Sequence, residues 1–207
     1  MQVSLNEVEV MSAKAACGAG RPWGLAQEAG WAVAQLEAMG LPGAQSLLGL
    51  LKATDGMEME ALTPETGGQV WAARDAPACP VVTGAYLADR GEVTGSVTIS
   101  ALYHPVLVLP FLQRLDGQAV LEWQGGSLAG GAEGVRVDCE PGVNIVRDVS
   151  LYGHDERPCT DAPAGSGAVD IDDEIWEALG AFAHRTYVPA SEASRLKGAG
   201  AGLTDND

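Results

Sequence analysis

Apolar residues in the N-terminal part of the chain recur at the spacing of amphipathic helices. Ser4-Leu5-Asn6-Glu7 has the form of a capping box, and helical spacing follows it until Gly18-Ala19-Gly20. A second helix ends at Gly40 and Pro42, and a third is expected over residues 44–53. The apolar face of the second helix consists of Leu25, Ala29, Val33, Leu36 and Met39.

From about Gln69 the pattern changes to short apolar runs that are rich in valine and interrupted by glycine and proline, which is typical of strands. Residues 80–90 begin with Pro80, which suits the first turn of a helix, so two predictions stay open for this segment, a helix or a strand. The segments predicted to be strands are residues 93–102, 118–124, 135–139 and 144–151.

Two further segments fit neither pattern. Residues 104–112 are the most apolar part of the chain and are expected to be deeply buried, but two prolines exclude them from a regular central strand. The glycines of residues 125–134 predict a turn or an exposed loop, and residues 161–167 are also expected to form a loop.

A final helix is predicted to begin at Asp170-Ile171-Asp172-Asp173, because acidic side chains are stabilised at the positive end of a helix. We therefore expect a single α+β domain over residues 1–190, in which the N-terminal helices and one C-terminal helix pack on a central antiparallel or mixed sheet. Residues 191–207 form a glycine-rich C-terminal tail. The apolar face of the final helix consists of Ile171, Ile175, Leu179 and Phe182.

Composition narrows the classes of function. The chain has 207 residues with 12 basic and 28 acidic side chains, a formal charge of −16, so it would repel nucleic acid. No apolar run approaches the roughly 18 residues that a membrane span needs. The N-terminus lacks the pattern of a targeting signal, and the four cysteines form no C-x-x-C pair, so we expect a cytoplasmic protein with reduced thiols.

The common catalytic and cofactor motifs are absent. Histidines and cysteines do not have zinc-site spacing, and neither a nucleophile elbow nor a phosphate-binding loop occurs, so we expect no metal and no cofactor. Ser194-Arg195-Leu196-Lys197 fits S-x-x-K, but its partner motifs are missing. The glycines of residues 198–202 follow no strand, which excludes a dinucleotide site there.

The C-terminal tail carries one candidate site. Ser191, Ser194 and Arg195, with the backbone N–H groups of the glycines, have the chemistry to wrap an anionic group, and the tail would then close over it as a lid. His184 and Tyr187 lead directly into this segment and are candidates for proton transfer. The alternative is a C-terminal segment without a function of its own.

A second candidate site is the turn before the second helix. Arg21, Trp23 and Glu28 supply a cation, an indole face and a carboxylate that would point the same way. The structural alternative makes Trp23 a hydrophobic staple and Glu28 an acid stabilised by the helix dipole. His104, inside the apolar segment, is expected to be a core histidine with satisfied ring nitrogens.

Two segments resemble a known family. Arg21-Pro22-Trp23-Gly24-Leu25-Ala26-Gln27-Glu28-Ala29-Gly30 and the stretch from Arg185 to Ser191, continuing through Ser194 and Arg195 to the glycine repeat, are similar to a bacterial family of about this length. That family is known only as a domain of unknown function. The resemblance implies that the tail belongs to the domain.

These observations leave three hypotheses. In the first, the protein is an enzyme that acts on a small carboxylate-bearing metabolite, with Arg195 binding the carboxylate, His184 or Glu28 moving a proton, and Tyr187 assisting. In the second, it is a noncatalytic accessory subunit that docks a partner protein. In the third, it is a homodimer in which each tail covers its neighbour.

Overall fold

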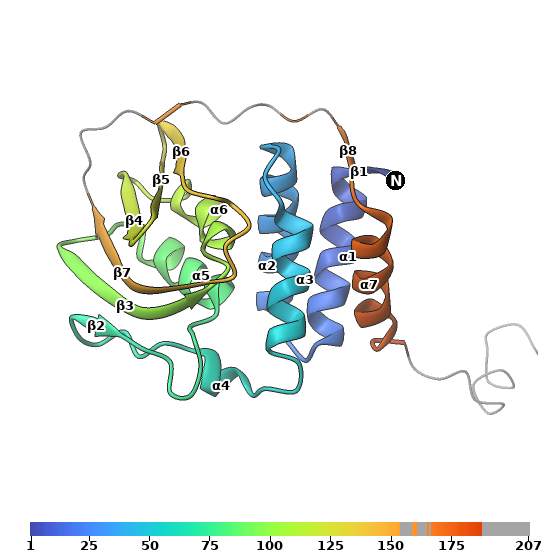
Figure 1. Ribbon diagram of the computed structural model, residues 1–207, viewed down its shortest axis with the longest axis horizontal. Coiled ribbons are helices and arrows are strands. Elements are labelled where there is room, and N and C mark those ends of the chain that lie inside the picture. Colours follow the sequence, from blue (N-terminus) through green and yellow to red (C-terminus); the bar gives the residue numbers. More distant parts are fainter. Residues whose placement is uncertain (154–158, 161–164, 166, 188–207) are drawn as a thin grey trace, which may run out of the picture.

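The computed structural model describes residues 1–153, 159–160, 165 and 167–187, which form a helical layer beside a mixed sheet (Figure 1). The helices are α1 (Leu5–Gly18), α2 (Trp23–Ala38), α3 (Gly43–Ala53), α4 (Met59–Leu62), α5 (Pro80–Arg90), α6 (Leu109–Leu112) and α7 (Asp173–His184), with a 3-10 turn η1 (Pro105–Val108). The strands are β1 (Gln2–Ser4), β2 (Val70–Trp71), β3 (Ser96–Tyr103), β4 (Ala119–Trp123), β5 (Gly126–Gly131), β6 (Gly134–Asp138), β7 (Ile145–Gly153) and β8 (Ala168–Asp170).

The helical layer consists of α1, α2, α3 and α7, which lie side by side in Figure 1. Small residues allow the backbones of these helices to approach closely. A methyl group on Gly30 of α2 would lie 2.5 Å from the Glu9 carbonyl oxygen and 2.9 Å from the Ala13 Cβ, both on α1. Only glycine therefore fits at position 30 in the present packing.

The capping box predicted for α1 is confirmed. The Ser4 hydroxyl accepts the Glu7 N–H at 3.2 Å, and the Glu7 carboxylate accepts the Ser4 N–H at 2.8 Å. The predicted start of the last helix was too early, because Asp170 belongs to β8 and α7 begins at Asp173 with Asp172 as its N-cap. Strand β8 pairs antiparallel with β1 and so places the start of α7 beside the start of α1.

The six-stranded sheet has the order β2-β3-β7-β4-β5-β6, with β2 and β3 parallel and the other neighbours antiparallel. The predicted α+β class is therefore confirmed. The four segments predicted as strands overlap β3, β4, β6 and β7, and residues 80–90 are the helix α5. None of the described helices has the length and apolar composition of a membrane span.

The prediction of a turn or exposed loop over residues 125–134 was wrong for most of that segment. Residues Gly126–Gly131 form β5, which is largely buried and pairs with β4 and β6. Its glycines admit close neighbours, because a Cβ on Gly130 would lie 2.8 Å from the Leu112 Cβ. The glycine composition reflects this close packing rather than a turn.

The apolar segment over residues 104–112 is buried as predicted, and its prolines start short helices. Pro105 begins η1, and Pro110 is near the start of α6. Phe111 of α6 packs against Gly84 of α5 so closely that a Cβ at position 84 would overlap the phenyl ring. This segment fills the space between the sheet and the helical layer and carries His104 at its beginning.

We expect Gly30→Ala to lower the free energy of unfolding by about 1–3 kcal/mol, because the added methyl group overpacks the contact between α1 and α2. Gly180→Ala is the matched control, since a Cβ on this glycine of α7 meets nothing within 4 Å. It should raise stability by up to about 1 kcal/mol through helix propensity. Urea unfolding checks both values, and equal effects would contradict the packing described for Gly30.

Candidate functional site

His184 and Tyr187 lie together in a surface groove between α1 and α7. Their rings contact edge to face, with centroids 5.5 Å apart, and Lys14 and Trp176 line the same groove. The Tyr187 side chain is 59% exposed, and His184 is also exposed. The predicted proton-transfer pair is therefore adjacent in space but open to solvent.

Glu28, the third predicted catalytic residue, faces a different part of the molecule. Its carboxylate accepts a hydrogen bond from Arg114 at 2.7 Å, and the Arg114 guanidinium stacks 3.4 Å from the centre of the Trp31 ring. The groove that contains His184 includes no residue of α2. Glu28 is thus engaged in an ion pair between α2 and the segment after α6.

The predicted cluster of Arg21, Trp23 and Glu28 does not form. Trp23 is 74% exposed at the start of α2, so it is not a hydrophobic staple, whereas Arg21 is 7% exposed and points inward. The predicted ligand-binding residues Ser191, Ser194 and Arg195 lie outside the described residues.

The most unusual residue of the described structure is His104, which connects β3 to η1. Its backbone is left-handed, with φ 33° and ψ 68°, a conformation that residues other than glycine rarely adopt. The His104 N–H donates to the Asn144 carbonyl at 2.7 Å, which holds this bend against the residue before β7. A strained backbone of this kind is a frequent feature of functional sites.

The His104 ring packs against the backbone of α3 at Gly49. A Cβ at position 49 would lie 2.5 Å from the ring carbon Cε1 and 2.6 Å from Nε2. Glycine in the middle of a helix lowers helix stability by up to about 1 kcal/mol relative to alanine. The close approach of the imidazole explains why glycine is needed here.

The prediction of a satisfied core histidine was only half correct. His104 is buried, at 5% exposure, but its Nδ1 is fully enclosed without a hydrogen-bond partner. Burial lowers the pKa of the imidazole below its usual 6.5, so the ring is neutral at pH 7. A buried and unpaired polar atom of this kind requires a functional or structural explanation.

His104 forms one wall of a surface pocket of about 210 Å³. Lys52, three residues after Gly49 on α3, supplies a positive charge, and Asn144, the residue before β7, also lines the pocket. The volume is below the roughly 300 Å³ of sites for drug-sized ligands, so a smaller polar molecule fits better. The complete lining consists of Gln45, Ser46, Leu48, Gly49, Lys52, His104, Gly142 and Asn144.

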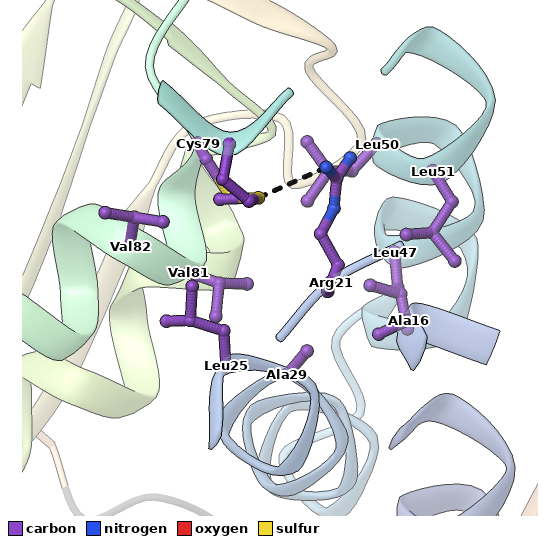
Figure 2. Close-up of a pocket in the computed structure, with 11 residues that line it drawn as sticks. Ala16, Arg21, Leu25, Ala29, Leu47, Leu50, Leu51, Cys79, Val81 and Val82 are labelled. Carbon is purple, nitrogen blue, oxygen red and sulfur yellow. Dashed lines mark hydrogen bonds between the residues drawn. The ribbon is translucent and has the colours of Figure 1, made fainter. Parts of the chain in front are cut away.

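The helix that carries Gly49 and Lys52 is anchored at its C-terminal end by Arg21. Figure 2 shows the Arg21 side chain extending into a cavity of about 10 Å³ between α2, α3 and α5. One terminal nitrogen donates to the Met59 sulfur at 3.2 Å, and the buried Nε has no partner. Burial lowers the pKa of this guanidinium and raises the pKa of the Cys79 thiol on the far side of the cavity.

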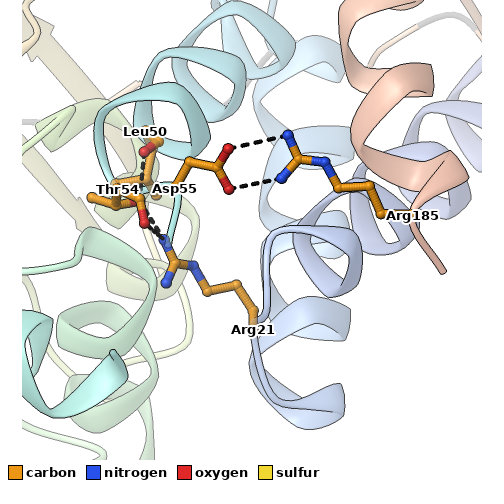
Figure 3. Close-up of polar contacts among 5 residues, drawn as sticks. All are labelled: Arg21, Leu50, Thr54, Asp55 and Arg185. Carbon is orange, nitrogen blue, oxygen red and sulfur yellow. Dashed lines mark hydrogen bonds and ion pairs between the residues drawn. The ribbon is translucent and has the colours of Figure 1, made fainter. Parts of the chain in front are cut away.

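The second terminal nitrogen of Arg21 binds Thr54, the C-cap of α3, through its carbonyl oxygen at 3.3 Å and through its hydroxyl. The Thr54 hydroxyl in turn donates to the Leu50 carbonyl at 2.7 Å. Next to it, Arg185 forms two hydrogen bonds with the Asp55 carboxylate, at 2.7 and 3.1 Å, and lowers its pKa (Figure 3). Two arginines thus hold the end of α3, where carbonyl groups favour a cation.

Two signals in the sequence mark the His104 pocket in retrospect. Gly49 is an isolated glycine inside an apolar helix, which indicates a close backbone approach. His104 precedes a proline at the end of a strand, where regular pairing stops. Neither signal shows that Gly49 and His104 are in contact, and this contact forms the wall of the pocket.

Comparison with known proteins finds a match to a family model and a likeness to solved structures. Residues 3–78 match the model of a family described as "Protein of unknown function (DUF3726)", which confirms the predicted resemblance to a family of that kind. No curated protein matches the sequence. Malate dehydrogenase from Entamoeba histolytica is similar in structure over 63% of this chain and 43% of its own, with 10% identity and a TM-score of 0.40, and this likeness assigns no function.

We expect the protein to lose stability as the pH falls below about 6.5. The unfolded chain protonates His104 near its usual pKa, while the native state resists protonation, so the free energy of unfolding should rise with pH up to the unfolded pKa. The contribution of this one group is at most about 1.4 kcal/mol per pH unit.

Urea unfolding at pH 5.5 and 7.5 measures this dependence. His104→Asn should reduce it, since asparagine tolerates the left-handed backbone. The exposed His184→Asn is the control. An undiminished pH dependence in His104→Asn would contradict the assignment.

The two arginines at the end of α3 should differ in their contribution to stability. Arg21→Met leaves the buried Thr54 carbonyl without its donor and should cost about 2–4 kcal/mol. Arg185→Met removes a half-exposed ion pair, which solvent screens, and should cost clearly less than Arg21→Met. Chemical denaturation of both variants tests this, and similar costs would show that Arg21 does not anchor α3.

Proposed function

We propose that the protein is an enzyme that acts on a small carboxylate-bearing metabolite in the His104 pocket. The observation that carries this proposal is a buried histidine, held by a left-handed backbone, in the wall of a pocket that also contains Lys52. In this proposal His104 transfers a proton, and Lys52 binds the carboxylate of the substrate.

The state of His104 suits a general base. A neutral imidazole accepts a proton directly, and a pKa near or below the working pH keeps it ready to do so. The backbone bend and the contact with Gly49 fix the ring, so little reorganisation is needed when the substrate binds. The same burial that lowers the pKa strengthens the interaction with a charged substrate.

The other polar groups of the pocket fit a small acid. Lys52 is exposed at the last turn of α3, where its ammonium group can meet an anion that enters from solvent. Gln45 and Asn144 add amide groups that donate and accept hydrogen bonds. Because the whole chain is strongly negative and repels anions, an anion in this pocket depends on the local positive charge of Lys52.

The groove of His184 and Tyr187 is the rival location for the same chemistry. It also combines one histidine with one lysine, Lys14. Its histidine is exposed, however, and so lacks the desolvation that distinguishes His104. The proposal of a lid formed by the C-terminal tail belongs to this groove and stays a prediction.

Matched substitutions distinguish the two locations. We expect succinate and lactate, used as carboxylate probes, to bind the wild-type protein in isothermal titration calorimetry. Lys52→Met should weaken this binding at least about ten-fold through loss of the ion pair. Lys14→Met should leave it unchanged, because Lys14 lies in the other groove.

NMR of the histidine rings tests the proton-transfer role in the same design. The pKa of His104, followed by NMR, should rise when succinate binds, because a nearby anion favours the imidazolium. The ring resonances of His184 should not change when succinate binds, because His184 lies in the other groove. Loss of binding in Lys14→Met rather than Lys52→Met would move the site to the other groove.

An accessory subunit that docks a partner protein is the second candidate function. The observation that favours it is Trp23, whose large apolar side chain is 74% exposed at the start of α2. Tryptophan is enriched at the centres of protein interfaces. A stable complex that Trp23→Ala abolishes, together with no response to any carboxylate probe, would support this function against the enzyme.

A further inference from the structure

The surface groove between α1 and α7 leaves apolar side chains exposed. This groove, which contains His184 and Tyr187, has a volume of about 350 Å³, and Val10, Met11 and Trp176 line it as well. Val10 is 44% exposed and Tyr187 is 59% exposed. Large apolar side chains that gather in one exposed place mark interaction surfaces, whereas single scattered ones do not. The groove is therefore a candidate docking surface.

The groove also contains a glycine inside a helix that no described neighbour requires. An added Cβ would lie 2.3–2.5 Å from another residue at Gly30, Gly49 and Gly84, which are the glycines in the middle of α2, α3 and α5. At Gly180 of α7, which lines the groove, a Cβ meets nothing within 4 Å. Glycine inside a helix lowers its stability relative to alanine, and its usual reason is the close approach of another backbone. At Gly180 that approach has to come from outside the described part of the chain.

The two ends of the groove carry charges of opposite sign. Helices α1 and α7 run side by side in Figure 1, and Glu7 lines the groove at the end where both begin. Hydrogen bonds from the Ser4 N–H and hydroxyl lower the pKa of the Glu7 carboxyl, which is therefore ionised at neutral pH. Lys14 lines the groove seven residues later, about 10 Å further along the axis of α1. Among the described residues, Lys14 has no ion-pair partner.

This order of charges is self-complementary. When two copies face each other with their α1 helices antiparallel around Val10, Glu7 of each subunit lies opposite Lys14 of the partner subunit. Both pairs form at once, as a two-fold axis requires, whereas parallel helices would place like charges opposite each other. Because each chain has a charge of −16, two copies repel each other unless acids of one meet cations of the other. The groove meets this condition.

We propose that the groove between α1 and α7 is the interface of a homodimer, in which the two α1 helices pack antiparallel and Glu7 and Lys14 form two reciprocal ion pairs around Val10. Gly180 allows the second copy to approach the backbone of α7 closely. The interface shares no lining residue with the His104 pocket. The inference therefore goes beyond the proposed enzyme and stands or falls independently of it.

Exchange of the two charges tests the symmetry of the interface. The full wild-type chain should sediment as a dimer in analytical ultracentrifugation. Lys14→Glu sets two acids opposite each other and Glu7→Lys sets two lysines opposite each other, so each variant alone should dimerise at least about ten-fold more weakly. An equimolar mixture of the two variants should form a heterodimer, because every pair then joins an acid to a lysine.

The control for this exchange is Arg90→Glu, which reverses the charge of an exposed residue on α5 and should leave the dimer unchanged. Far-UV circular dichroism confirms that each variant is folded. A wild-type protein that stays monomeric, a dimer that neither variant weakens, or a mixture of folded variants that does not associate would each overturn the proposal.

A second variant covers the case in which Glu7→Lys does not fold without its capping box. Gly180→Leu adds a side chain that meets no neighbour within its own chain at Cβ but fills the groove, so it should abolish the dimer while its Tm at high dilution is kept or raised. Ala181→Leu is the matched control, since Ala181 is exposed on α7 and does not line the groove, and it should keep the dimer.

The same pair of variants separates the other possible occupants. If residues 188–207 of the same chain or an unrelated protein filled the groove, the pure wild-type protein and both leucine variants would sediment as monomers. That result, or a Gly180→Leu protein that dimerises as tightly as Ala181→Leu, would overturn the proposal.

Discussion

The structure depends on how the C-terminal end of α3 is held by the buried guanidinium of Arg21. The free carbonyl groups at the end of a helix need donors when they are buried, and Arg21 brings one from the turn between α1 and α2. Because α3 also carries Gly49 and Lys52, the position of this helix determines the shape of the His104 pocket. One arginine thus links the packing of the helical layer to the candidate site.

The His104 pocket exists because tertiary packing holds two residues in places that their local backbone preferences disfavour. A glycine inside α3 and a left-handed histidine after β3 are each unfavourable for the local backbone. Together they allow the imidazole to lie against a helix with a ring nitrogen left unpaired. Natural proteins tolerate such local conflicts mainly where function requires them.

Much of the fold was predictable because its signals are local. The capping box of Ser4 and Glu7 and the apolar faces of α1, α2 and α7 are visible within short windows of the sequence. Strand β5 was not predictable, since its glycines are explained by distant neighbours such as Leu112. The candidate site was missed for the same reason: Gly49 and His104 lie far apart in the chain, and no local pattern joins them.

The contact between α1 and α7 has a consequence for synthesis on the ribosome. Helix α1 leaves the ribosome first, but the helix that covers its outer side, α7, is made only after the whole sheet. The family match ends at residue 78, so that segment contains α1 to α3 without this cover. Native packing of the helical layer therefore waits until α7 has been made, and the side of α1 that α7 covers stays accessible to chaperones until then.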